Sequence, residues 1–222
     1  MNRLGIVVDI SHASDQGKAA AIEASAAPVV TSHNGVRHFA RVIGNMSDDL
    51  LLALAEKGGL IGLHSAGWLI KQEAADWNER TRETRRASAP SEPVGPSSRP
   101  AAIDYGAYVD ALDAEMRARW LGAWGYGTPW RRRHDEAVAA GAPLPSVDEW
   151  AAQVDYLVEL LGPDHVGIGL DLMAGGNWLR DFDATGYPRL TEALLAAGLG
   201  EEVIRKVLGE NWLRILDAAR VP

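Results

Sequence analysis

The chain has 222 residues, of which 47% are hydrophobic and 23% charged, a composition typical of an ordinary globular protein. Its formal net charge of −8 disfavours nucleic acid or an anionic membrane surface as the main partner, because both attract basic proteins. The absence of cysteine excludes disulfides, thiolate zinc sites and cysteine nucleophiles, so any bound metal must be held by His, Asp or Glu. No apolar run predicts a membrane-spanning helix, and the first residues lack the apolar core of a signal peptide.

Four short runs of aliphatic and β-branched residues predict the strands of a buried parallel sheet. They span residues 5–10, 28–31, 60–63 and 166–170. Helical patterns that begin at the capping residues Ser47 and Ser146 separate the last three strands, and two more, at 190–197 and 201–219, follow the fourth. The alternation of strands and helices predicts right-handed βαβ units, and therefore an α/β fold.

Residues 71–145 interrupt this alternation. They contain a proline- and serine-rich segment at 87–100, which we expect to be irregular, and a helical pattern at 105–120. Long interruptions of this kind are usually lids or binding loops, so we interpret this one as an insertion on the active-site side of the sheet. Residues 1–222 otherwise form one domain.

Polar side chains follow all four predicted strands: His12, His33, His64 and Asp171. Because ligand-binding residues of parallel α/β folds lie just past the carboxyl ends of the strands, we expect these four to share one edge. A lone histidine there would commonly just cap its strand. Two imidazoles, His12 and His33, can instead hold one zinc or similar divalent ion, with their nitrogens about 3–4 Å apart. Asp171 is interpreted as a metal ligand, a base for metal-bound water, or a structural cap.

Six segments carry a specific pattern in a fixed order. They are residues 2–12 (NRLGIVVDISH), 27–34 (APVVTSHN), 45–49 (NMSDD), 58–62 (GGLIG), 164–171 (DHVGIGLD) and 209–214 (GENWLR). Together they resemble the second half of the membrane (renal-type) dipeptidases, a family of zinc metallopeptidases, and they cover nearly the whole chain outside residues 71–145.

The resemblance implies a (β/α)8 metal-dependent hydrolase barrel, of which this chain would hold about the last four βα units. In that family two zinc ions share a carboxylate, and a bridging hydroxide attacks the peptide bond of a dipeptide. By resemblance His12 and His33 would bind one zinc, and Asp171 would be the catalytic carboxylate. The residues expected to contact the substrate are Asn34, Arg41 and His64.

Several departures from the family pattern bear on activity. The His-x-Asp pair that binds the first metal and the bridging Glu are absent, because the chain starts at what would be the fifth strand. Gly44 stands where the family has the arginine that binds the substrate carboxylate, so we assign that role to Arg41, three residues upstream. His64 stands where many relatives have Asn. The usual Asp-Phe-Asp-Gly is replaced at 171–174, so its second carboxylate is lost.

Two interpretations of this half-length resemblance compete. One is a truncated dipeptidase that is inactive alone; the other is a non-catalytic half-barrel remnant that acts through association, or through a residual metal site. Four strands cannot close an eight-stranded barrel, so both interpretations require a partner half, a homodimer or a rearranged fold. A third class, an amidohydrolase-type barrel, would need a ligating lysine at a strand end. The lysines considered for that role lie elsewhere: Lys18, Lys57, Lys71 and Lys206.

Overall fold

A computed structural model describes residues 1–81, 128–172, 179–180, 182 and 185–220, with 128–133 as backbone. Its centre is a sheet of four strands in chain order, and every neighbouring pair is parallel. The strands are β1 (Val8–Asp9), β2 (Val29–Asn34), β3 (Leu60–Leu63) and β4 (Val166–Ile168). The prediction of an α/β fold with a parallel sheet is therefore confirmed.

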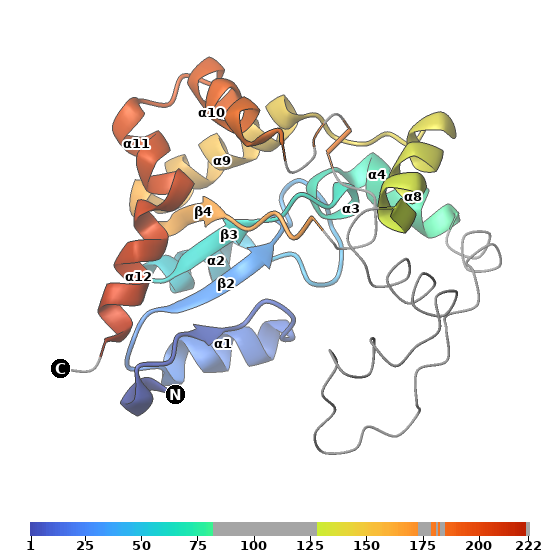
Figure 1. Cartoon of the computed structure of the whole chain (residues 1–222). Helices are drawn as coiled ribbons and strands as arrows, with labels where there is room; N and C mark the ends of the chain where they lie inside the picture. The colour runs from blue at the N-terminus through green and yellow to red at the C-terminus, as the bar shows by residue number, and fades with distance from the viewer. Residues whose placement is uncertain (82–127, 173–178, 181, 183–184, 221–222) are drawn as a thin grey trace, which may run out of the picture.

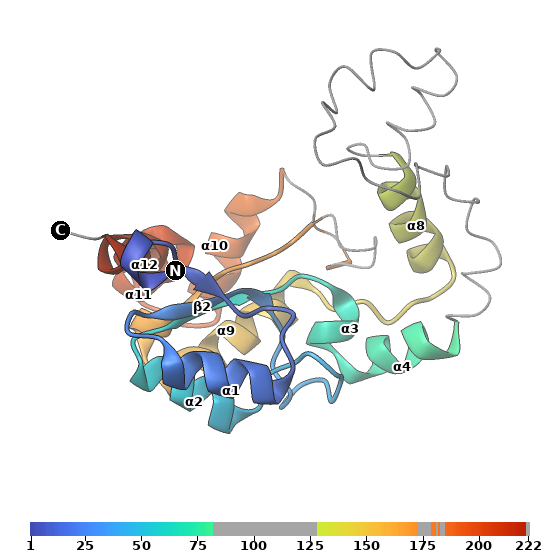
Figure 2. The same ribbon diagram turned by 90° about the horizontal axis from the view of Figure 1, so that it is seen from below.

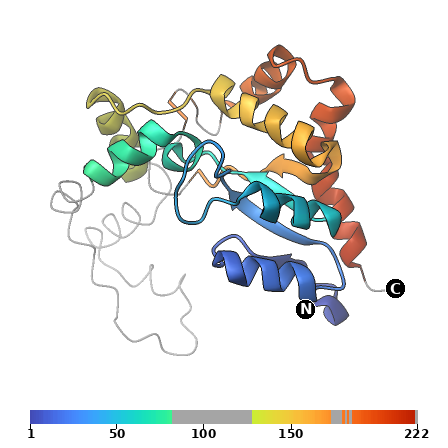
Figure 3. The same cartoon turned by 180° about the vertical axis from the view of Figure 1, so that it is seen from behind.

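Helices connect the strands and cover one face of the sheet. Seen from behind, α1, α2 and α9 lie across the strands (Figure 3), and the side chains of these helices meet those of the sheet in the main hydrophobic core. The helical elements before β4 are η1 (Asn2–Leu4), α1 (Asp15–Ala24), α2 (Asp48–Glu56), α3 (Gly67–Ile70), α4 (Gln72–Arg80), α8 (Thr128–Ala139), α9 (Val147–Leu161) and η2 (Pro163–His165). Those after it are α10 (Tyr187–Ala196), α11 (Glu201–Arg205), η3 (Lys206–Glu210) and α12 (Asn211–Ala219).

The two ends of the sheet carry different helices. Helix α12 lies at the end where the strands begin, whereas α3, α4 and α8 lie at the end where the strands stop (Figures 1 and 2). The side chains of Val30 and Leu60 pack with Ile215 of α12 in a second, smaller cluster, separate from the main core. Because α4 and α8 belong to residues 71–145, the carboxyl edge of the sheet faces the segment predicted as an insertion.

Local capping explains why two of the helices begin where the sequence predicts. The Ser47 side chain accepts a hydrogen bond from the Leu50 backbone at the start of α2. The Ser146 side chain accepts one from the Glu149 backbone, and the Glu149 side chain accepts one from the Ser146 backbone, which completes a capping box. These two predicted helices are confirmed.

Several element boundaries differ from the prediction, among them the end of the fourth strand, which stops at Ile168 instead of Leu170. The first strand is only Val8–Asp9, because the chain before it forms the 3₁₀ turn η1, which ends at Gly5 with φ 65°. The second strand runs to Asn34, so that His33 lies within it instead of after it. The single helix predicted over 201–219 is kinked at Gly209, which has non-helical backbone angles within the π-helical turn η3.

The described ends of the 71–145 segment are helical, as α4 and α8. The predictions of an irregular 87–100 and a helical 105–120 fall outside the described residues. Within the described part of the chain, no helix is long and apolar enough to cross a membrane.

Candidate metal and catalytic site

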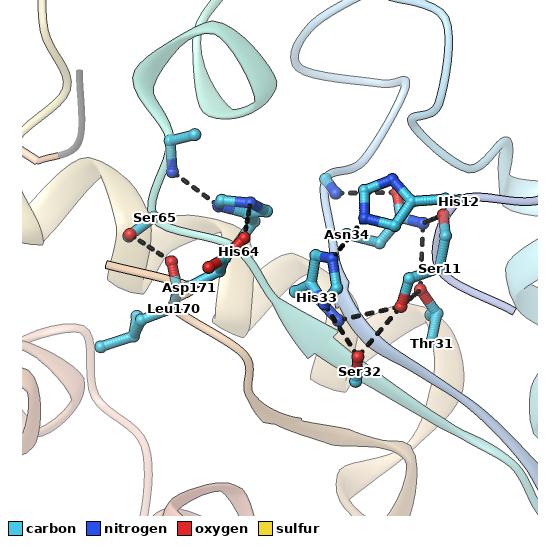
Figure 4. A network of polar contacts seen from close by, with 12 residues as sticks. Ser11, His12, Thr31, Ser32, His33, Asn34, His64, Ser65, Leu170 and Asp171 are labelled. Carbon is cyan, nitrogen blue, oxygen red and sulfur yellow. Dashed lines mark hydrogen bonds and ion pairs between the residues drawn. The ribbon is translucent and has the colours of Figure 1, made fainter. Parts of the chain in front are cut away.

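The four predicted side chains lie in a row along the carboxyl edge of the sheet (Figure 4). The ring centroids of His12 and His33 are 4.8 Å apart, and those of His33 and His64 are 5.6 Å apart. The row ends at Asp171, whose Oδ2 lies 3.6 Å from His64 Nε2. The structure thus brings together the strand-end residues that the sequence singled out.

An irregularity in β2 positions His33. The pairing register with β3 shifts between Thr31 and Asn34, and the consecutive residues Ser32 and His33 are both half-buried, whereas a regular strand turns one of them to each face. A Cβ added at Gly62 would lie 2.2 Å from the Ser32 carbonyl oxygen, and one added at Gly169 would lie 2.1 Å from it. Glycine at these two positions therefore allows the close backbone approach on which the irregularity depends.

His12 and His33 face each other through their Nε2 atoms, which are 2.8 Å apart. Two Zn–N bonds of about 2.0–2.1 Å in tetrahedral geometry place the nitrogens roughly 3.3 Å apart, so a shared ion requires the rings to separate by roughly 0.5 Å. Because His12 is exposed, its ring has room for that movement. The pair fits a divalent cation such as zinc, although no third His, Asp or Glu joins it among the described residues.

His64 is held from three sides. Its backbone N–H donates to the Asn34 carbonyl at 2.9 Å, and its own carbonyl accepts from the Trp150 indole at 3.1 Å. Its ring Nδ1 accepts from the Ala66 backbone N–H at 2.8 Å. Since a backbone N–H can only donate, the neutral ring carries its proton on Nε2, which faces Asp171.

Burial controls the charge of His64. The side chain is 4% exposed, and its desolvation lowers the pKa of His64 to about 4. The carboxylate of Asp171 acts in the opposite direction, and the neighbouring His33 and His12 lower the pKa further. At neutral pH His64 is therefore an uncharged donor directed at the Asp171 carboxylate.

Asp171 adopts an unusual backbone conformation. Its φ is 44°, the only positive φ outside glycine among the described residues. Ser65 supports the turn, because its backbone N–H and its hydroxyl both donate to the carbonyl of the preceding residue, Leu170. Left-handed backbone at a non-glycine residue is uncommon and is concentrated at functional sites. The Asp171 side chain remains 38% exposed and so can reach a ligand.

The two other candidate substrate residues differ in exposure. The Asn34 amide is buried, donates to the Ser11 carbonyl and the Thr31 hydroxyl at 3.3 and 3.0 Å, and accepts from the Gly35 N–H at 3.0 Å. Arg41 is exposed on the loop between β2 and α2, and its backbone N–H donates to the Gln72 side chain at the start of α4. Of these two, only Arg41 has a side chain open to solvent.

Sequence reasoning assigned no role to three polar residues beneath the histidine pair: Asp9, Ser11 and Ser32. Hydrogen bonds join the side chains of all three residues to one another. Ser32 Oγ also lies 2.8 Å from His33 Nδ1. The signal that could have found them is the position of Asp9 in the first apolar run and of a serine directly before each of His12 and His33.

A parallel sheet with a histidine pair and a nearby carboxylate at its carboxyl edge is typical of metal-dependent hydrolases of the α/β class. The profile of the membrane dipeptidase family (peptidase family M19) matches residues 1–221. The chain therefore belongs to this family of metallopeptidases, in agreement with its six sequence motifs.

Individual relatives are distant and longer. The chain is 24% identical over 216 residues to dipeptidase 3 of Rattus norvegicus, a match that covers 97% of this chain and 30% of the relative. It is 21% identical over 217 residues to dipeptidase tcpJ of Claviceps purpurea, covering 97% of this chain and 35% of the relative. The chain thus spans about a third of the length of these two curated relatives.

Solved structures agree on the fold. The probable dipeptidase PvdM from Pseudomonas aeruginosa superposes with a TM-score of 0.68 at 22% identity, covering 98% of this chain and 51% of that one. A metallopeptidase from Rhodobacter sphaeroides, solved with a phosphinate mimic of the dipeptide L-Ala-D-Ala, gives a TM-score of 0.59 at 24% identity. That match covers 99% of this chain and 44% of the other.

Proposed function

We propose that this chain is the C-terminal half of a zinc-dependent dipeptidase, equivalent to about the last four βα units of a (β/α)8 barrel, with an insertion at about 71–145. Four parallel strands in chain order support the half-barrel, as does a fold match to about half of a dipeptidase-like chain. The observation that carries the metal assignment is the 2.8 Å approach of the His12 and His33 Nε2 atoms at the carboxyl edge.

In this proposal His12 and His33 supply two ligands to one zinc ion. The remaining ligands of a two-metal centre come from outside the described residues, among which no group of three potential ligands occurs. Zinc bound there would polarise the scissile carbonyl and make water a better nucleophile. Because one two-histidine site lacks most of these donors, we propose that the 222-residue chain alone is inactive.

The chain's own residues would then perform three tasks. Asp171 takes the proton of the attacking water and returns it to the leaving amine, a role worth about 10²–10⁴ in rate. Arg41, exposed on the loop that follows β2, binds the α-carboxylate of the dipeptide. Because His64 and Asn34 are buried, we propose that they act behind the substrate, His64 by holding Asp171 and Asn34 by bracing the ends of β1 and β2.

The test compares this chain with the product of its reading frame extended upstream of Met1, which the proposal expects to encode the His-x-Asp pair and the bridging Glu. With added zinc, the longer protein should hydrolyse a simple dipeptide such as alanyl-alanine, and the 222-residue chain should not. Asp171→Asn should lower kcat of the longer protein at least 10²-fold, whereas the exposed Asp49→Asn should leave it unchanged.

Three results would overturn parts of this proposal. A stop codon in the upstream frame would favour the non-catalytic half-barrel. A kcat within about threefold of the parent would reduce Asp171 to a structural role, against the larger loss that proton transfer predicts. Turnover by the 222-residue chain alone, lost in His33→Ala, would refute the inactivity of the isolated half.

A further inference from the structure

The Asp9 carboxylate lies beneath the histidine pair and accepts four hydrogen bonds. Its Oδ1 accepts from the Ser11 N–H at 3.0 Å, the Ser11 hydroxyl at 2.6 Å and the Ser32 N–H at 3.0 Å, and its Oδ2 accepts from the Ser32 hydroxyl. Partial burial alone would raise the pKa of Asp9, but these hydrogen bonds outweigh it, and the pKa lies below its ordinary value. Asp9 is therefore ionised at neutral pH and can only accept hydrogen bonds.

The direction of the single Ser32 hydroxyl hydrogen determines the tautomer of His33. Ser32 Oγ contacts Asp9 Oδ2, His33 Nδ1 at 2.8 Å and Ser11 Oγ at 3.1 Å, and the contact with the carboxylate is the shortest of the three. Because the carboxylate has no proton to give, the Ser32 hydrogen points to Asp9. Ser32 Oγ must then accept from His33 Nδ1, so the proton of the neutral ring is on Nδ1. The lone pair is left on Nε2, the atom that faces His12.

His64, whose ring lies edge-on to that of His33, is held in the opposite tautomer. Its Nδ1 accepts from the Ala66 N–H, so its proton is on Nε2 and cannot leave that atom without breaking this bond. Two adjacent histidines thus present opposite groups to the site: His33 a lone pair, suited to a cation, and His64 an N–H, suited to the Asp171 carboxylate. The difference comes from one local partner on each Nδ1 atom.

We propose that Asp9 is a positioning residue that acts through Ser32 to hold His33 in the tautomer able to bind a metal. The proposal rests on the zinc site proposed above. In Asp9→Asn the new amide can donate to Ser32 Oγ, and the Ser32 hydrogen then turns to His33 Nδ1. The proton of His33 moves to Nε2, which removes the lone pair from the ligand position. Loss of a residue that orients a metal ligand through hydrogen bonds typically lowers metal affinity about 10–100-fold.

The first measurement is independent of zinc. Nitrogen-15 NMR of the chain in chelator at neutral pH distinguishes a protonated from an unprotonated ring nitrogen at each position. Wild-type His33 should be protonated on Nδ1 and His64 on Nε2. Asp9→Asn should move the His33 proton to Nε2, Ser32→Ala should give a mixture, and Ser32→Thr, which keeps the hydroxyl, should restore the wild-type state. Wild-type His33 protonated on Nε2 would overturn the proposal, even if a variant failed to fold.

The second measurement is zinc affinity, by competition with a chromophoric chelator. Asp9→Asn and Ser32→Ala should weaken binding 10–100-fold, Ser32→Thr should bind within about threefold of wild type, and Asp49→Asn is the matched control for a lost surface carboxylate. No zinc binding by wild type would refute the proposed zinc site, whereas the NMR result would still decide the tautomer. Wild-type binding that survives unchanged in Asp9→Asn and Ser32→Ala would refute the role of Asp9 alone.

Discussion

His64 should make the folded chain lose stability as the pH falls from 7 to 5. Its pKa is about 4 in the folded chain, against an ordinary value of 6.5, because burial disfavours the charged ring. Below pH 6.5 the unfolded chain binds a proton at this residue and the folded chain does not, so acid favours unfolding until the folded pKa is reached. At pH 5, which is about 1.5 pH units below the unfolded pKa, the loss amounts to about 2 kcal/mol.

The assay is urea unfolding at pH 7 and pH 5 in the presence of a chelator, for wild type and His64→Asn. Asparagine does not titrate, and its side-chain oxygen can still accept from the Ala66 N–H. All other histidines are common to both proteins, so their contributions cancel. The free energy of unfolding of wild type should fall about 2 kcal/mol more than that of His64→Asn. Equal losses in the two proteins would refute the buried, neutral state of His64.

Two further predictions concern folding. Gly62→Ala should destabilise the chain by about 2–3 kcal/mol in thermal or urea unfolding, because its Cβ would meet the Ser32 carbonyl at 2.2 Å. Gly200→Ala, where nothing lies within 4 Å, is the control, and equal effects would show that β2 tolerates the added atom. Ser146→Ala should lower the free energy of unfolding by about 1 kcal/mol, because it removes the cap of α9. Ser146→Thr keeps a capping hydroxyl and should retain most of that stability. An Ala variant as stable as wild type would show that the cap contributes nothing measurable.

Local signals explain the parts of the fold that the sequence predicts well. The capping box of Ser146 and Glu149 lies within four residues of chain, and the strand at 60–63 is a continuous apolar run, so neither depends on distant contacts. The length of β2 depends on Gly62 in β3 and on Gly169 just after β4, both of which admit the Ser32 carbonyl. A contact between three segments far apart in the sequence leaves no local pattern in any one of them, so the predicted second strand ends too early.

At the site, too, local features are predictable from the sequence and features that depend on distant contacts are not. The row from His12 to Asp171 follows from one rule, that residues after parallel strands meet at one edge, and the sequence therefore predicts it. The burial of Asn34 and the tautomers of the histidines depend on which donor reaches each side chain, which only the folded chain defines. The kink at Gly209 was likewise not predicted, because one glycine in a helical pattern does not by itself end the helix.

Zinc titration of the purified chain against a competing chelator tests the central claim, that His12 and His33 share one ion. We expect weak binding of about one zinc per chain, weakened at least tenfold further in His12→Ala and in His33→Ala. His38→Ala, which removes an exposed histidine stacked on Tyr156, should bind as wild type. Unaltered zinc binding in His12→Ala and His33→Ala would contradict the account, because the ion would then be held elsewhere.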